Sequence, residues 1–217
     1  MIEGRKKMKK RDIPGTGYEK TKNKILETAT ELFALKTLNA VSMRDIANAV
    51  GIRAGSIYNY YESKDALMDD IMSCLEKGYR HYIEWVAGMN AEAETLEELI
   101  DNLFNEEFMK GHDPMGCFRI TIALKEQHRV ESARNCVYEL FYGLSISSIK
   151  ADFDRLIAKG VVSPIDTKTI STLIMFCVMA GNEIRMYDFI GKKPPLDCSE
   201  TYSCLKKIIH TILRHSY

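Results

Sequence analysis

Residues 42–67 constrain the fold of this chain more than any other segment, because they predict two short helices joined by a glycine turn. Ser42 is a favourable N-cap residue, and Asp45 three positions later completes a capping box. Gly51 ends the first helix, since glycine adopts a left-handed backbone at little steric cost. Ser63 then caps a further helix. The arrangement is typical of a helix-turn-helix, whose second helix enters the major groove of DNA.

The second helix of this segment, expected over residues 54–60, is too short to be stable without its neighbours. Only Ile57 is expected to point into a core. Ser56, Tyr58, Asn59 and Tyr60 are left largely outward. The helix therefore presents polar and aromatic groups to something outside the core.

Residues 20–70 resemble the DNA-binding head of the TetR family of transcriptional repressors. In that family the first helix follows the pattern Ile-Leu-x-x-Ala-x-x-Leu-Phe. Leu38-Asn39-Ala40 departs from the family, which has a glycine near this bend, and Asn39 is expected to keep the bend because it tolerates positive φ. The residues that carry the match are Ile25, Leu26, Ala29, Leu32, Phe33, Ile46, Ala47, Gly51, Gly55, Ser56, Ile57, Tyr58, Tyr60, Tyr61, Ser63, Lys64 and Leu67.

The resemblance implies a role on DNA for nine residues of the head. Four could reach base edges or nearby phosphates, because arginine can bind guanine and asparagine adenine through two hydrogen bonds; they are Arg44, Arg53, Ser56 and Asn59, with Ala54 beside them. Four more are expected to bind phosphates and so set the register; they are Ser42, Tyr58, Tyr60 and Lys64. For Tyr60 packing against the next helix is the alternative, and for Tyr61 packing is the expectation.

The charge distribution agrees with a head at the N-terminal end. Residues 1–64 hold 13 Lys/Arg against 7 Asp/Glu, and the remainder holds 17 against 23. Phosphate neutralisation supplies much of the affinity for DNA. Residues 5–11 are the densest basic run, and they are either a disordered tail or an arm that follows the DNA backbone or its minor groove. Residues 2–5 also resemble a protease-cleavage sequence used with recombinant proteins.

The rest of the chain predicts an all-α body. We therefore expect a basic, disordered arm (1–17), a three-helix head (18–67) and a helical effector-binding and dimerisation body (68–217). No apolar run is long enough for a membrane span and no secretory signal opens the chain, so a cytoplasmic protein, nucleoid-associated when bound to DNA, is expected. The expected body helices run from Ser63 to Trp85 or Gly88 and over residues 95–111, 115–127, 130–159, 166–190 and 199–215.

In the family the last two long helices pair with those of a second copy, so residues 166–190 and 199–215 are expected to form a homodimer. Ala180 and Gly181 would permit close approach. The alternative is that both helices only close the core of the monomer. Two heads on a two-fold axis would read a near-palindromic operator.

The family also binds a small molecule in a mostly apolar cavity of the body, shifting the helix that begins at Ser63. For each candidate lining residue ordinary core packing is the alternative, although together they suit a hydrophobic effector. The candidates are Trp85, Met89, Phe104, Phe108, Met115, Phe118, Tyr138, Tyr142, Met175 and Met179.

The cysteines show no metal-site or redox spacing. There is no Cys-x-x-Cys pair, so inert packing is expected for Cys74, Cys117, Cys136, Cys177, Cys198 and Cys204. No metal and no cofactor are expected. The alternative is a regulator that senses metal, haem or oxidants through these residues or through His81, His112 and His128.

The sequence thus predicts a ligand-responsive, homodimeric repressor released from operator DNA by a small effector. The sequence contains no phosphate-binding glycine loop, no nucleophile elbow and no HExxH motif. We therefore do not expect an enzyme, and the remaining possibility of an enzyme or carrier with a vestigial helix-turn-helix has no supporting motif.

Overall fold

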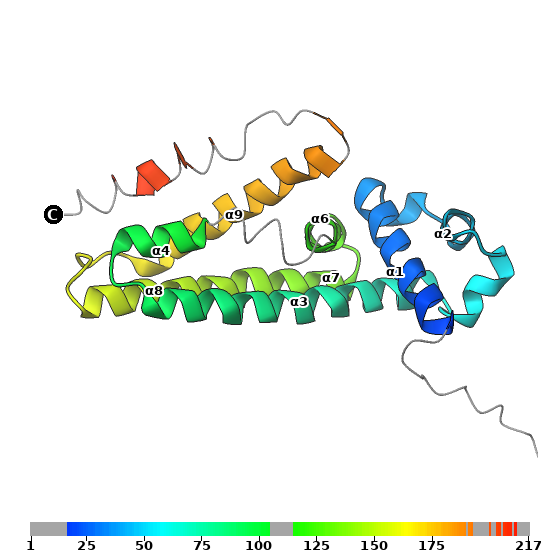
Figure 1. Cartoon of the computed structure of the whole chain (residues 1–217), viewed down its shortest axis with the longest axis horizontal. Helices are drawn as coiled ribbons and strands as arrows, with labels where there is room; N and C mark the ends of the chain where they lie inside the picture. Colours follow the sequence, from blue (N-terminus) through cyan, green and yellow to red (C-terminus); the bar gives the residue numbers. More distant parts are fainter. Residues whose placement is uncertain are drawn as a thin grey trace, which may run out of the picture.

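A computed structural model describes residues 17–104 and 115–189, together with residues 191–192, 200, 203–204, 206–209 and 211. Every regular element in these residues is helical, which confirms the all-α prediction. A small head lies at one end of an elongated body (Figure 1). The basic arm predicted for residues 1–17 falls outside the described residues except for Gly17. No helix in the described part of the chain is long and apolar enough to span a bilayer.

The head consists of α1 (Gly17–Leu35), η1 (Leu38–Ala40), α2 (Met43–Val50) and η2 (Ala54–Asn59), a short 3₁₀ helix. The predicted capping box is present, since the Asp45 N–H donates to Ser42 Oγ at 3.2 Å and the Ser42 N–H donates to Asp45 Oδ2 at 2.9 Å. The hydrogen bonds from Ser42 lower the pKa of Asp45. Gly51 has φ 84°, the left-handed conformation expected at the end of α2.

The bend before α2 differs from the expectation for Asn39. No described residue other than glycine has positive φ, so Asn39 does not provide a left-handed bend. Residues 38–40 form the single turn η1 instead, and Leu38 is buried within it. A 3₁₀ turn reverses the chain with ordinary negative φ angles, so no glycine is needed there.

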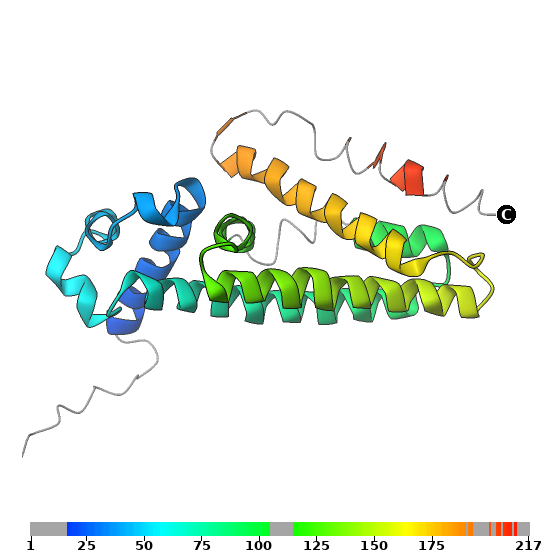
Figure 2. The same ribbon diagram turned by 180° about the vertical axis from the view of Figure 1, so that it is seen from behind.

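One long helix, α3 (Lys64–Glu92), runs from the head along the body (Figures 1 and 2). Ser63 caps it by accepting a hydrogen bond from the Ala66 N–H at 3.0 Å. The helix continues past the ends predicted at Trp85 or Gly88, because no proline interrupts it and Val86 and Asn90 are buried against the body. The predicted boundary at residue 67 lies inside this helix, and it remains a prediction.

The remaining body helices are α4 (Leu96–Leu103), α6 (Gly116–Glu126), α7 (Glu131–Asn135), η3 (Cys136–Ser145), α8 (Ile146–Ala158) and α9 (Thr167–Phe189). The long helix predicted over residues 130–159 is present as the continuous run α7–η3–α8, but η3 has wide π-helical turns. Ser145 Oγ donates to the Leu140 carbonyl at 2.9 Å and shares a hydrogen bond of 2.9 Å with the Tyr79 hydroxyl. The helix predicted from residue 95 ends at Leu103 in the described range, and its remainder falls among residues that the structure does not describe.

The hydrophobic core does not separate the head from the body. One cluster joins Ile25 and Phe33 of α1 to Phe118 and Ile122 of α6 and to Phe141 of η3. A second cluster lies between α4, α8 and α9. The predicted helix 199–215 lies mostly outside the described residues; within it, Ile209 is buried and Lys206 pairs with Asp101 at 2.7 Å.

Candidate nucleic-acid interface and ligand cavity

The head exposes a polar surface along α2 and η2. Ile57 is fully buried and anchors η2. Arg44 on α2, Arg53 before η2 and Asn59 at its end are exposed, and the Tyr58 ring is 56% exposed. Ala54 and Ser56 are half-buried on the same short helix. The arrangement can present guanidinium, amide and phenol groups together to a nucleic-acid groove.

Tyr60 packs within the head, so the structure gives it a structural contact in addition to its predicted phosphate role. Its ring stacks on Tyr18 with centroids 4.8 Å apart, and the Tyr18 hydroxyl donates to the Asn59 carbonyl at 3.3 Å. Tyr18 thus holds the end of η2, a contribution that the sequence did not reveal because 41 residues separate it from Asn59. Tyr61 is buried as expected, and its hydroxyl donates to Asp70 Oδ2 at 3.0 Å. Burial and the Asp70 carboxylate raise the pKa of Tyr61.

Two of the predicted phosphate ligands are engaged in intramolecular hydrogen bonds. The Lys64 ammonium donates to the carbonyls of Leu38 at 2.8 Å and Val41 at 3.1 Å. The Ser42 hydroxyl donates to Asp45 Oδ2 at 2.6 Å. Both residues therefore stabilise the bend before α2, and their contacts with phosphate remain predictions. Because Lys64 fixes this bend, its removal would affect folding as well as DNA binding.

We expect Asn59→Ala and Tyr58→Phe to have different effects on DNA binding. A lost base contact relaxes preference at particular base pairs by about 1–3 kcal/mol, whereas a lost phosphate contact weakens all sequences alike. Asn59→Ala should therefore flatten the differences among operator variants, and Tyr58→Phe should lower every affinity by a similar factor. Fluorescence anisotropy with a set of singly substituted operators measures both effects. Identical profiles for the two variants would show that the role assignment is wrong.

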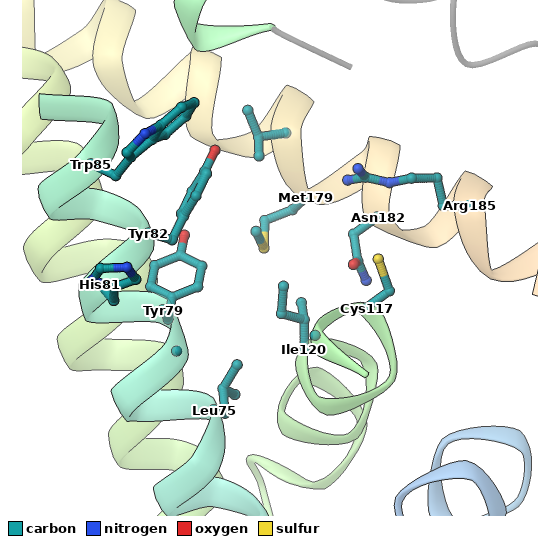
Figure 3. Close-up of a pocket in the computed structure, with 13 residues that line it drawn as sticks. Leu75, Tyr79, His81, Tyr82, Trp85, Cys117, Ile120, Met179, Asn182 and Arg185 are labelled. Carbon is teal, nitrogen blue, oxygen red and sulfur yellow. The ribbon is translucent and has the colours of Figure 1, made fainter. Parts of the chain in front are cut away.

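The body contains a largely apolar cavity of about 180 Å³ between α3, α6 and α9 (Figure 3). Trp85, Tyr82 and Leu75 come from α3, and Ile120 and Cys117 come from α6. From α9, Met179, Asn182 and Arg185 complete the wall. The cavity thus lies where three helices meet, and two of them contact the head.

Of the ten predicted lining residues, Trp85 and Met179 line this cavity. Tyr138 and Tyr142 do not line it: they are 63% and 42% exposed on η3, because the face of η3 that carries both points away from the core. Phe104 and Phe118 do not line it either, since both are buried in the core clusters. The structure does not place Met89, Met115 or Met175 on the cavity wall, and Phe108 lies outside the described residues.

Several residues of the cavity were missed by the sequence analysis. Gly78, Tyr79, His81 and Tyr82 lie one or two helical turns before Trp85, so the spacing of α3 could have indicated them. Asn182 and Arg185 carried a clearer signal, because they are polar residues three positions apart in a strongly apolar helix. Neither residue is aromatic or a methionine, which are the residue types from which the cavity lining was predicted.

Two cysteines of the described chain, Cys136 and Cys177, lie in surroundings that make their thiols poorly reactive. Burial raises the pKa of the Cys136 thiol to about 11 and also raises the pKa of Cys177, which keeps both thiols protonated and poorly reactive. No group of three or more His, Cys, Asp or Glu side chains within the described residues could hold a metal ion. Cys198 and His112 are not among those residues.

Comparisons with known proteins agree with this geometry. The model for bacterial regulatory proteins of the tetR family matches residues 25–71. The repressor KstR2 of Rhodococcus jostii is 38% identical over 87 residues, which are 39% of this chain and only 42% of that relative. The HTH-type regulator YhgD of Bacillus subtilis is 25% identical over 81% of this chain and 87% of its own.

The fold also matches a solved TetR-family transcriptional regulator from Cytophaga hutchinsonii. The two chains are 16% identical and superpose with a TM-score of 0.62 over 93% of this chain and 98% of the other. The match of the head to the family model, the all-helical fold of the body and the curated relatives all indicate the same family. The head over residues 25–71 therefore matches the tetR family of bacterial regulatory proteins, and the described chain as a whole has the fold of a solved TetR-family transcriptional regulator.

Proposed function

We propose that this chain is a homodimeric repressor that binds a near-palindromic operator and is released when a small molecule enters the cavity between α3, α6 and α9. The main support for this proposal is that one end of α6 lines the cavity and the other end is hydrogen-bonded to the head. Gly116, Cys117 and Ile120 lie at the cavity. Lys125 and Glu126, at the opposite end of α6, bind the head.

The contacts between α6 and the head are specific. The Lys125 ammonium donates to the Ala34 carbonyl at the end of α1, at 2.8 Å. The Leu38 N–H donates to Glu126 Oε1 at 3.0 Å, and the Glu126 side chain is buried. A ligand that displaces the first turn of α6 would therefore pull on the bend that precedes α2. A cavity-to-head connection of this kind is a physical basis for ligand-dependent release.

The dimerisation proposal is supported by an exposed apolar face on α9. Leu173 and Phe176 are 41% and 55% exposed, and Tyr187 is 37% exposed. Ala180 lies on the same exposed side, whereas Gly181 is buried and does not contribute to this face. The Tyr142 ring of η3 packs edge to face against Phe176, with ring centroids 6.3 Å apart, and extends this exposed apolar face. An exposed apolar face of this kind supports the proposal that α9 packs against a second copy of the chain.

Binding to DNA upstream of the gene that encodes this chain tests the proposal directly. We expect the full chain to protect a near-palindrome there, with the logarithm of affinity falling linearly and steeply with the logarithm of salt concentration. Footprinting locates the site, and titrations at several salt concentrations give the slope. A flat salt response would contradict binding through the basic head.

We expect Glu126→Ala to weaken the connection between α6 and the head, with Glu126→Gln as the matched control. The alanine variant leaves the buried Leu38 N–H without its acceptor, which costs about 1–3 kcal/mol in the free energy of unfolding. The glutamine variant keeps an acceptor oxygen and should retain most of the stability. Urea unfolding compares the two variants. Equal losses would mean that the hydrogen bond to Leu38 contributes nothing.

A further inference from the structure

One buried cation beside the cavity, Arg185, has two guanidinium nitrogens without a hydrogen-bond partner among the residues that the structure describes. Arg185 on α9 is 9% exposed, and its Nε and Nη2 atoms have no hydrogen-bond partner. One helical turn earlier, Asn182 is 1% exposed; its Nδ2 donates to Thr121 Oγ1 of α6 at 3.2 Å, while its Oδ1 has no partner. Figure 3 shows both side chains on the α9 side of the cavity, opposite Trp85 and Tyr82.

A guanidinium in this position is energetically unfavourable unless something neutralises it. Arginine stays protonated in proteins, so it cannot escape burial by losing its charge. Leaving a buried charge and its N–H donors unpaired is strongly destabilising. An apolar side chain of similar length would fill the same space without this cost. The position therefore suits a ligand that supplies the missing acceptors.

We propose that the cavity binds an amphipathic carboxylic acid, with its carboxylate on Arg185 and its apolar part between Trp85, Tyr82 and Met179. This inference rests on the proposed function and names the chemical class of the effector. A carboxylate accepts two parallel hydrogen bonds from a guanidinium. Arg185 is the only Lys or Arg in the described lining, which matches one negative charge and not the two of a phosphate monoester.

The remaining lining fits the apolar part of such a molecule. Leu75, Ile120 and Met179 line the cavity, and Figure 3 shows Met179 and Ile120 between Tyr82 of α3 and Asn182 of α9. The volume of about 180 Å³ is below the ~300–1,000 Å³ of pockets for drug-sized ligands, so a small acid is expected. The Thr121 hydroxyl can either donate or accept a hydrogen bond, so the Asn182 amide can rotate and still bind Thr121. In the rotated orientation Asn182 presents an N–H donor to the ligand.

The carboxylate site is also well placed to act on α6. The hydrogen bond from Asn182 to Thr121 joins α9 to α6 beside Arg185. A carboxylate that recruits the Asn182 amide changes this bond. Because α6 binds the head through Lys125 and Glu126, a change in the hydrogen bond between Asn182 and Thr121 would be transmitted to the head along α6.

The single tryptophan of the chain reports on this cavity, so its fluorescence provides the test. Decanoate and 4-phenylbutyrate are titrated into the purified full chain beside their methyl esters. We expect the acids, and not the esters, to change Trp85 emission. Arg185→Gln should lower the affinity for the acids by about 10- to 100-fold, the loss expected for a hydrogen bond to a charged group. Arg185→Lys should lower it less, and Lys168→Gln, an exposed charge on the same helix, should leave it unchanged.

A second measurement needs no ligand. Arg185→Met removes the unpaired charge and should raise the Tm of the ligand-free chain, whereas a lower Tm would mean that Arg185 already has a protein partner and would overturn the proposal. Failure of both acids to bind at 1 mM, or equal binding of acids and esters, would also overturn it. If esters bind and release operator DNA, the ligand-responsive function stands and only the carboxylate assignment is wrong. If the acids bind through Arg185 without changing operator affinity, the assignment stands and ligand-responsive release is wrong.

Discussion

Phe176→Glu is expected to make the chain monomeric and to weaken operator binding by about 100-fold or more, because two linked heads gain about 10²–10⁴ over one. Phe176 is the most exposed of the apolar side chains on the α9 face, at 55%. A carboxylate there would have to be buried unpaired in the proposed dimer, and unpaired buried charges are not tolerated. In the monomer the same side chain points to solvent, so its folding should be little affected.

Light scattering after size exclusion gives the oligomeric state, and anisotropy with a full palindrome and with a half-site gives the affinities. Val161→Glu is the matched control, since Val161 is an apolar residue that is 42% exposed outside α9. We expect the control to remain dimeric and to bind as the wild-type chain does. A dimeric Phe176→Glu variant with unchanged affinity would place the interface elsewhere.

The second large effect is expected for Ile57→Ala. Ile57 is the one fully buried side chain of η2, so it is the core anchor of the short helix that carries Tyr58 and Asn59, in addition to the hydrogen bond from Tyr18 at its end. Truncating a buried isoleucine costs about 2–5 kcal/mol in the free energy of unfolding. Because η2 loses its anchor, binding should weaken for every operator sequence, including non-specific DNA.

Ile57→Val separates packing from recognition, since it removes one methylene and costs about 0.5–1.5 kcal/mol. Urea unfolding followed by far-UV circular dichroism measures the stability of both variants. The head and α6 share one hydrophobic cluster, so the loss should appear in the unfolding of the whole described unit and not in a separate early transition. A separate transition for the head would show that this cluster does not couple the two parts.

The head could be predicted from the sequence because its determinants are local. Ser42 and Asp45 are three residues apart, and Gly51 acts through its own backbone angle. The bend at residues 38–40 is kept, as predicted, but as a 3₁₀ turn and not through a left-handed Asn39. Its conformation was not predictable, because Lys64 and Glu126 bind its backbone from distant parts of the chain. The π-helical turns of η3 were likewise not predictable, since Ser145 meets Tyr79 across 66 residues.

The cavity was only partly predictable for a related reason. The sequence shows which residues are apolar, but it does not show which faces of α3, α6 and α9 meet. Trp85 and Met179 lie in the cavity, whereas Tyr138 belongs to the same aromatic class and lies on the surface. Arg185 is informative only in three dimensions, where its burial without a partner can be recognised.

The uninterrupted course of α3 has a mechanical consequence. With its 29 residues and a rise of about 1.5 Å per residue, the helix is a rod of about 43 Å that joins the cavity wall to the head. A tilt of about 5° at one end of such a rod moves the other by about 4 Å, which is roughly the spacing of 3.4 Å between successive base pairs. In a two-headed molecule, a lever of this length would turn a side-chain-sized displacement at the cavity into a mismatch of one base-pair step.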